Sequence, residues 1–295
     1  MTSSEATEPR LTLLLALADD ELILGHRHAE WTGWAPYIEE DLAFSSVAQD
    51  EMAHARLLYR LARDGGLTDR DPDELALGRE PDEYRNAVLC ERPNGDWGYT
   101  VARHFLYDTA DAVRLEALAE SSWKELAEAV KVVQLEEKYH VDHSVTWFAK
   151  LAQGPAEARQ RFADGLSAAL GDALALFEPL PGEETLVADG VLPRANEDML
   201  AEWLSRTGSR LEEAALDYVL ERHASLGEMV PTGSGEIPDQ GEGFRSPGVV
   251  YRDGRWVHEG EFQGAGGRHG RHSEDFLAVW EEMTGLYRAH PGAKW

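Results

Sequence analysis

The chain has 295 residues and a formal charge of −27, from 55 acidic and 28 basic residues, so nucleic acid and anionic membranes are poor partners for it. Cys90 is the single cysteine, which excludes an intramolecular disulfide and suits a reducing compartment. Because we find neither a signal peptide nor an apolar run near the ~18 residues of a membrane span, we expect a cytoplasmic protein.

Four long helices are predicted in the first half of the chain, because apolar residues recur there at steps of three and four. Gly65-Gly66 ends the second helix, and Ser122 with Glu125 is typical of a capping box that opens the fourth. The stretch 65–95 is rich in proline and glycine and suits a long crossover with a short helix near 80–90. The four helices are expected at 9–32, 36–64, 97–119 and 122–152.

The second half adds helices and one region of different character. Helices are expected at Ala156–Phe177, at Asn196–Leu226 and at about 273–289, the last opened by a cap at Ser273. Residues 227–272 are glycine-rich and indicate a loop insertion, inside which 249–257 predicts a β-hairpin that turns at Asp253-Gly254. We expect one all-α domain over 1–295, a ferritin-like four-helix bundle at about 9–152 with accessory C-terminal helices and a small β-hairpin insertion.

Two copies of one tetrapeptide pattern carry the chemistry. Glu51 and His54 form one Glu-x-x-His, and Glu137 and His140 form the other. Residues three apart lie on the same face of a helix, so each pair offers a carboxylate and an imidazole to one metal ion. In ferritin-like bundles two helices carry this motif and each of the other two supplies one further carboxylate.

The further carboxylates can be located by distance along the chain. In an antiparallel helical hairpin, two residues face each other when they are equally far from the turn. Glu21 lies 30 residues before Glu51 with the midpoint at Pro36, and Asp108 lies 29 before Glu137 with the midpoint beside Ser122. Both pairs therefore lie about 15 residues, or roughly 22 Å, from a turn. The predicted metal ligands are Glu21, Glu51, His54, Asp108, Glu137 and His140.

Other interpretations of these residues stay open. A surface location, or a buried polar network without metal, would produce the same pattern. Asp111 or Glu116 replaces Asp108 if the helical register differs. Asp19 and Asp20 adjoin Glu21 but miss the apolar stripe. His28 and Glu40 share stripes with the ligands and are interpreted as outer polar groups, with direct metal contact as the alternative, whereas His104 is expected to pack or cap locally.

The ligand types favour particular metals. Carboxylates and imidazoles suit iron or manganese better than they suit a zinc site built from thiolates. Two metal ions about 3.5–4 Å apart could bind and activate oxygen between them. The residues alone therefore predict a di-iron protein, with manganese as the alternative, and they name no substrate.

Several segments resemble a known family. The run 17–31 (LADDELILGHRHAEW), the segments ERPNGD at 91–96 and EKYH at 137–140, and the terminal PGAKW at 291–295 resemble the C subunits of ring-1,2-phenylacetyl-CoA epoxidase. The likeness covers nearly the whole chain, and 229–265 looks like an insertion. It implies a helical subunit that pairs with a catalytic A-type subunit of the same oxygenase, for which a reductase subunit supplies electrons.

The resemblance leaves two functional classes open. C subunits of this family are described as structural, with a degenerate metal site, whereas Glu21, Glu51 and His54 complete a ligand set here. The chain is thus expected to be either a scaffold for the A-type subunit or a di-iron oxygenase in its own right. Apolar aromatic surface expected on the last three helices predicts an obligate partner, either the A-type subunit or a second copy of the chain.

Overall fold

The computed structural model describes residues 7–221, 248–259 and 266–293. It is an all-α bundle with one small β-hairpin, as the sequence predicts, and no described helix is long and apolar enough to cross a membrane. The long helices are α1 (Thr7–Ala29), α2 (Ile38–Asp64), α5 (Trp97–Leu118), α6 (Lys124–Ala152), α7 (Ala156–Leu174), α9 (Asn196–Glu213) and α11 (Glu274–Ala289).

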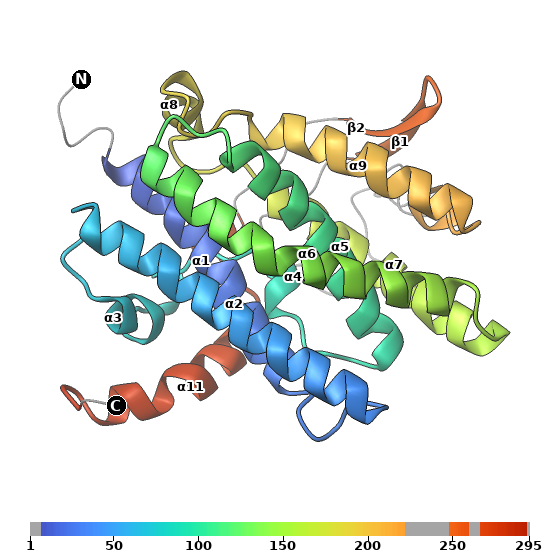
Figure 1. Cartoon of the computed structure of the whole chain (residues 1–295), viewed down its shortest axis with the longest axis horizontal. Coiled ribbons are helices and arrows are strands. Elements are labelled where there is room, and N and C mark those ends of the chain that lie inside the picture. The colour runs from blue at the N-terminus through green and yellow to red at the C-terminus, as the bar shows by residue number, and fades with distance from the viewer. Residues whose placement is uncertain (1–6, 222–247, 260–265, 294–295) are drawn as a thin grey trace, which may run out of the picture.

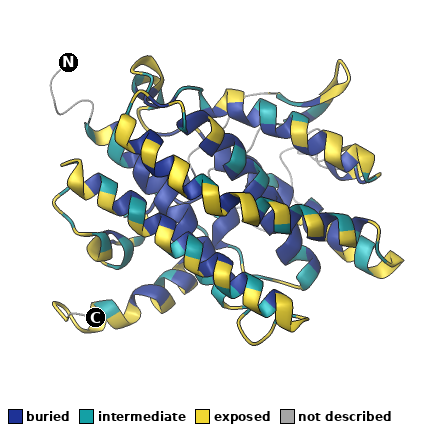
Figure 2. Ribbon diagram, viewed as in Figure 1, coloured by how far each residue is buried: buried dark blue, intermediate teal, exposed yellow. Residues whose placement is uncertain are grey.

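The four central helices form two layers. α1 packs against α2 and α5 packs against α6, which makes two helical hairpins, and α7 covers the outer side of α5. Figure 1 shows α2 and α6 side by side nearest the viewer, with α1 and α5 behind them. Figure 2 shows the consequence for burial: α2 and α6 alternate between buried and exposed turns, whereas the helices behind are largely buried.

Close helix contacts in this core depend on small residues. A Cβ on Gly25 of α1 would lie 3.2 Å from both the Ala48 carbonyl oxygen and the Met52 side chain of α2. On the other side of the bundle, a Cβ on Gly165 of α7 would lie 2.8 Å from the Tyr99 Cα of α5. Glycine therefore brings α1 onto α2 and α7 onto α5 at backbone distance, which fixes the heights of their polar side chains.

The connection between the two hairpins is long, as expected. It contains α3 (Pro72–Leu77), a 3₁₀ turn η1 (Pro81–Glu83) and α4 (Val88–Glu91) where a single short helix was predicted. Arg79 and Asn86 of this connection are fully buried. The crossover is thus part of the core and contributes charged groups to it.

Two serines predicted to cap helices, Ser122 and Ser273, form no side-chain hydrogen bond to the helix that follows them. The Ser122 hydroxyl donates to the Asp189 carbonyl instead of to the helix, and α6 begins at Lys124 without a side-chain cap. Ser273 does precede α11, but its hydroxyl donates to Glu91 at 2.6 Å. In both cases a tertiary acceptor, distant in the sequence, competes successfully with the local helix end.

The predicted helix 196–226 is also corrected, because α9 ends at Glu213. Ala215 takes a left-handed conformation with φ of 51°, and the Leu216 amide donates to the Leu211 carbonyl at 2.7 Å. Glycine usually occupies such a position, so the sequence carries no stop signal there. Helix resumes over residues 218–221, where Tyr218 is exposed, and residues 222–226 lie outside the described residues.

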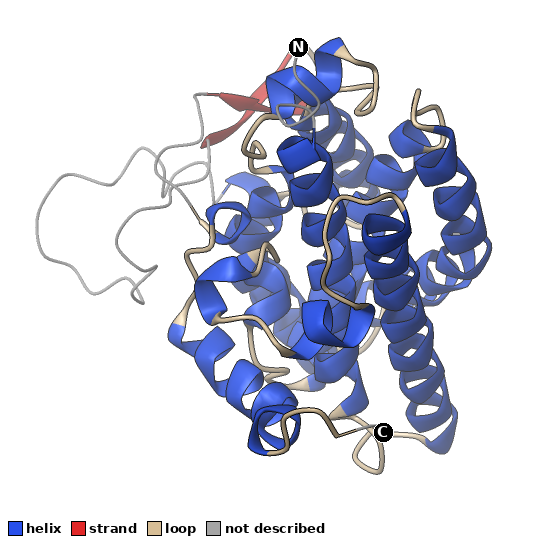
Figure 3. Ribbon diagram, turned by 90° about the vertical axis from the view of Figure 1, so that its left-hand side faces the viewer, coloured by secondary structure: helices blue, strands red, loops and turns tan. Residues whose placement is uncertain are grey.

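The remaining elements pack around the bundle. The hairpin of β1 (Gly248–Arg252) and β2 (Arg255–Glu259) turns at Asp253-Gly254, as predicted, and buries Trp256 against Gly208 of α9. The rest of the predicted insertion lies outside the described residues, apart from the 3₁₀ turn η3 (Gly267–His269) and the residues next to it. Figure 3 shows the hairpin and the end of α11 at opposite ends of the molecule. The last two short elements are the 3₁₀ turn η2 (Ala175–Phe177) and α8 (Glu183–Ala188).

Candidate metal centre

Three of the six predicted ligands form a tight buried group. Glu21 of α1, His54 of α2 and Glu137 of α6 each offer a ligand atom, and these atoms lie within 4.8 Å of one another. His54 Nδ1 is 3.2 Å from Glu21 Oε2 and 3.3 Å from Glu137 Oε1. All three side chains are at most 5% exposed. Three helices thus direct carboxylate and imidazole atoms at one point inside the bundle.

The other three predicted ligands are buried around this group. His140 Nδ1 lies 3.0 Å from Glu137 Oε1, so both motifs meet at the same carboxylate. The charges of Glu21, Glu137, Asp108 and His140 all act on Glu51. The Oδ2 atom of Asp108 is buried and has no hydrogen-bond partner among the described residues. The structure therefore brings all six into one electrostatic cluster, although only three fall within the tightest group.

Burial and the charges of neighbouring groups shift the pKa values of the carboxyl groups in the cluster. Burial, together with the charge of Glu137, raises the pKa of Glu21. Burial and the charge of Glu21 raise the pKa of Glu51 well above its usual value. Burial alone would also raise the pKa of Glu137, but the charge of His140 and hydrogen bonds with His140 and His54 lower it to about 2. In the absence of metal, protons and imidazolium ions share the task of neutralising these acids.

The pKa values of the two histidines are raised, which favours their charged forms beside these acids. Burial by itself would lower the pKa of His54, but hydrogen bonds with Glu137 and Glu21 outweigh it and raise the pKa to about 12. Burial opposes protonation of His140 too, but Glu137 and then Glu51 raise its pKa to about 10. A metal cation would replace these ring protons on the atoms that face the carboxylates.

Each histidine also contacts an acid through Nε2, the ring nitrogen that does not face Glu137. His54 Nε2 lies 2.8 Å from Glu136 Oε2, and His140 Nε2 lies 3.4 Å from Asp50 Oδ2. Each acid comes from the helix opposite its histidine and directly precedes the motif glutamate on that helix. Such contacts fix the ring orientation of ligating histidines. Sequence reasoning missed both acids, although an acid before each Glu-x-x-His was a visible signal.

His28 and Glu40 take the outer positions expected for them. His28 Nδ1 is 2.9 Å from Glu51 Oε2, so this ring supports a predicted ligand. Glu40 lies in the first turn of α2, where it accepts a hydrogen bond from the Trp147 indole at 2.7 Å and lies 2.8 Å from His143 Nε2. Neither belongs to the tight group of ligand atoms.

His104 was expected to pack or cap locally, but it contacts a predicted ligand, Asp108. Its Nδ1 lies 3.2 Å from Asp108 Oδ1, and its Nε2 lies 3.1 Å from His143 Nδ1. Because His143 in turn contacts Glu40, a continuous row of polar side chains leads from Asp108 through the partly exposed His143 to the buried Glu40. His104 lies four positions before Asp108 on α5, and that spacing was a signal for this pair.

The two substitutes considered for Asp108 have other partners. Asp111 pairs with Arg114 at 2.7 Å, and burial raises its pKa to about 8 despite that arginine. Glu116 is half-exposed and pairs with Arg206 at 2.7 Å. Asp108 and Asp111 each keep one buried carboxylate oxygen without a hydrogen-bond partner among the described residues, and what distinguishes them is that Arg114 pairs with Asp111 whereas no described arginine pairs with Asp108. Asp108 is therefore kept as the predicted ligand of α5.

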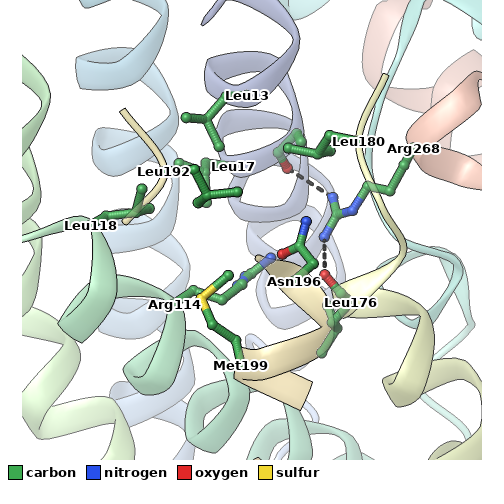
Figure 4. A pocket seen from close by; sticks show the side chains of 11 residues that line it. Leu13, Leu17, Arg114, Leu118, Leu176, Leu180, Leu192, Asn196, Met199 and Arg268 are labelled. Carbon is green, nitrogen blue, oxygen red and sulfur yellow. Dashed lines mark hydrogen bonds between the residues drawn. The ribbon is translucent and has the colours of Figure 1, made fainter. Parts of the chain in front are cut away.

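A small pocket lies at another place in the bundle. Figure 4 shows it between leucines of α1 and the segment 176–199, with Arg114 and Arg268 at its edge. Arg268 donates to the carbonyl oxygens of Ala16 at 3.1 Å and Leu176 at 3.0 Å. Asp20 engages both guanidinium groups, the Asn196 amide donates to Glu183 at 2.7 Å, and the other lining residues are apolar, so we place no chemistry in this pocket.

The six residues fit a pair of divalent cations. The set provides four carboxylates and two imidazoles, which suits iron and manganese, and two divalent ions would neutralise the four acids. The Oδ2 atom of Asp108 is a ligand atom that the described residues leave without a hydrogen-bond partner, and the raised pKa of Glu51 reflects burial beside other acids with too little positive charge. Burying such groups without a partner is costly.

The chain resembles known proteins over most of its length. The chain is 27% identical over 287 residues to the C subunit of the 1,2-phenylacetyl-CoA epoxidase of Escherichia coli (strain K12), a match that covers 95% of this chain and 97% of that relative. The profile of one protein family, described as phenylacetic acid catabolic protein, matches residues 1–228. The chain therefore belongs to the family of phenylacetic acid catabolic proteins.

Proposed function

We propose that this chain is the C-type subunit of a 1,2-phenylacetyl-CoA epoxidase complex that acts in phenylacetate catabolism, where it pairs with a catalytic A-type subunit. The family membership and the end-to-end match to a subunit of that name support this role. The same comparison does not favour a stand-alone oxygenase with a different substrate. We assign the complex to the cytoplasm, because Cys90 is a buried free thiol and suits a reducing compartment.

We further propose that the chain keeps a metal pair of its own. Glu21, Glu51, Asp108 and Glu137 would supply carboxylates and His54 and His140 would supply imidazoles, with iron as the expected metal and manganese as the alternative. Bound iron would supply redox chemistry with oxygen. Glu136 and Asp50 would hold the two rings with Nδ1 toward the metal. The observation that carries this proposal is the convergence of four buried acids with no arginine beside their carboxylates among the described residues.

A second role is compatible with part of the geometry. Glu137 already lies close to both His54 and His140, and the rings have raised pKa values. A pair of imidazolium ions could therefore hold the cluster together without metal, in a subunit that serves as a scaffold. The two roles differ in metal content, which is directly measurable.

Metal analysis of the purified chain tests the proposal. The chain is expressed with ample iron and manganese, and its metal content is measured by mass spectrometry beside that of Glu51→Ala/Glu137→Ala. We expect close to two metal ions in the parent and none in the double variant, with similar helical circular dichroism. Glu116→Ala is the matched control, because Glu116 is an exposed acid with a surface partner. A parent chain without stoichiometric metal would establish the scaffold role.

A further inference from the structure

Exposed apolar side chains gather on one face of the molecule. Seven of the twelve large apolar residues that are exposed in the described chain lie on α2, on α6 or in the turn before α2. Of the last three helices, on which a partner surface was expected, α7 and α9 bury their large apolar residues in the chain's own core, whereas α11 exposes Leu277 and Leu286. Clustered exposed apolar groups mark an interaction surface. The seven are Trp34, Tyr37, Ile38, Leu42, Val132, Leu135 and Tyr139.

The exposed residues share one orientation. On α6 they recur at steps of three and four, and on α2 the exposed positions 39, 42, 46, 49, 53, 56, 60 and 63 follow the same rule. Since α2 and α6 lie side by side at the front of the bundle, these stripes form one surface, which we call the α2/α6 face. Leu135 and Tyr139 lie near its middle and are 70% and 71% exposed.

The charge of this face differs from that of the rest of the chain. Its exposed side chains on α2 and α6 include seven basic and six acidic residues, in a chain with 28 basic and 55 acidic residues. Four of the five lysines of the chain lie on α6. Lys124, Lys131 and Lys138 are spaced by seven and border the apolar residues on that helix. The surface is thus an apolar centre with cations at its rim.

The exposed cations of the α2/α6 face form no ion pair with the described residues, although Lys150 lies over the Trp147 ring. Lys124, Lys131 and Lys138 form no ion pair with the described residues, and the same holds for Arg56, Arg60 and Arg63 of α2. Elsewhere exposed arginines such as Arg161 and Arg206 contact two acids each. Unpaired cations around an apolar centre fit a protein surface that presents carboxylates in the matching places.

The face also covers the side of the candidate metal centre that is nearest to solvent. α2 and α6 approach each other less closely than each approaches its hairpin partner. Glu136, half-exposed, and Asp50, one-third exposed, lie between them and contact His54 and His140. A protein seated there would remove these two acids from water and close this side of the centre.

We propose that the α2/α6 face is the docking surface for another subunit of the complex, a protein that presents carboxylates around apolar side chains. The inference rests on the proposed function for the identity of that subunit, the A-type catalytic one. A second copy of this chain is a poorer occupant, because each copy carries a charge of −27 and a symmetric contact would bring the same unpaired cations together.

Binding of face variants to the A-type subunit tests the docking surface. Leu135→Asp/Tyr139→Asp should weaken binding at least tenfold, because it places charge in the apolar centre. Lys131→Glu/Lys138→Glu should slow association and flatten its salt dependence. Leu286→Asp and Arg210→Glu are the matched controls, since both residues are exposed on other helices. Thermal unfolding of every variant shows that it is folded.

The outcomes separate the two proposals. If the parent chain does not bind the A-type subunit, the proposed function fails. If the parent binds and the folded Leu135→Asp/Tyr139→Asp variant binds equally well, the function stands and the docking surface is wrong. If the parent forms a homodimer that this variant dissociates, while binding of the A-type subunit is unaffected, the face joins two copies of the chain and the proposal is likewise overturned.

Discussion

Three consecutive acids of α1 are all buried, but their carboxylates have two different kinds of partner. The three are Asp19, Asp20 and Glu21. Asp19 contacts Arg79 and the Tyr59 hydroxyl. Asp20 accepts bonds from Arg114 at 2.7 Å and from Arg268 at 2.7 and 2.8 Å. Among the described residues no arginine reaches Glu21, which meets the Tyr107 hydroxyl and His54 instead.

The difference shows how a structural acid can be distinguished from a candidate ligand. The charges of Arg268 and Arg114 overcome the effect of burial and lower the pKa of Asp20, whereas burial and Glu137 raise the pKa of Glu21. Asp20 is therefore neutralised by fixed cations that belong to the chain. Glu21 belongs to a cluster whose balance depends on exchangeable ions, either protons or metal. Burial alone does not separate the two acids; the kind of partner does.

The largest expected effect comes from removing a fixed cation. Arg268→Met leaves Asp20 with one of its two guanidinium partners, and breaking such a buried pair costs about 3–5 kcal/mol of unfolding free energy. Arg206→Met is the matched control, because its pair with Glu116 is half-exposed and such pairs contribute about 0–1 kcal/mol. Urea unfolding at pH 7 measures both. Equal losses in the two variants would contradict the structural role of the arginine.

The helical part of this architecture could be predicted from local pattern. Steps of three and four along α1, α2, α5 and α6 set the helix faces. Equal distances from two turns predicted Glu21 opposite Glu51 and Asp108 opposite Glu137, whereas the contacts that the structure gives are Glu21 with His54 and Asp108 with His104. Helix periodicity and chain reversal are properties of neighbouring residues, so one sequence suffices for them. The fold class and the hairpin at Asp253-Gly254 followed in the same way.

The buried charges of Asp19 and Asp20 could not be predicted in that way. Both miss the apolar stripe of α1, but this helix is covered on all sides, by the crossover that carries Arg79 and by the C-terminal segment that carries Arg268. Arg268 is 248 residues away from Asp20 along the chain. No periodicity in α1 encodes a partner at that separation, and the same limit explains the lost caps at Ser122 and Ser273.

A smaller effect is expected from an outer acid of the centre. Glu136→Gln weakens the contact that orients His54, so metal affinity should fall about 10–100-fold. Because Glu136 is half-exposed, the unfolding free energy of the metal-free chain should change by less than about 1 kcal/mol. Metal titration and urea unfolding measure the two quantities. Glu128→Gln, an exposed acid two turns earlier on α6, is the control. Unchanged affinity would remove Glu136 from the centre.

The smallest expected effect is a difference between Asp20 and Glu21 in how each residue's contribution to the unfolding free energy changes with pH. The folded pKa of Asp20 is lowered from 3.8, so its contribution to stability is present above pH 4 and is lost as pH falls through the folded value. The folded pKa of Glu21 is raised from 4.5, so the metal-free folded chain holds a proton that the unfolded chain releases, and stability declines as pH rises above that value.

Two isosteric variants should therefore respond to pH in opposite ways. In chelator-treated protein, the destabilisation by Asp20→Asn should be largest at neutral pH and shrink below pH 4. Glu21→Gln removes a penalty that grows with pH, so its stability relative to the parent should improve from pH 4 toward pH 8. Urea midpoints across this range measure both, with Glu116→Gln as the exposed control. Slopes of the same sign would mean that Glu21, like Asp20, is held as a carboxylate by the folded chain without metal, and the distinction between the two regions would disappear.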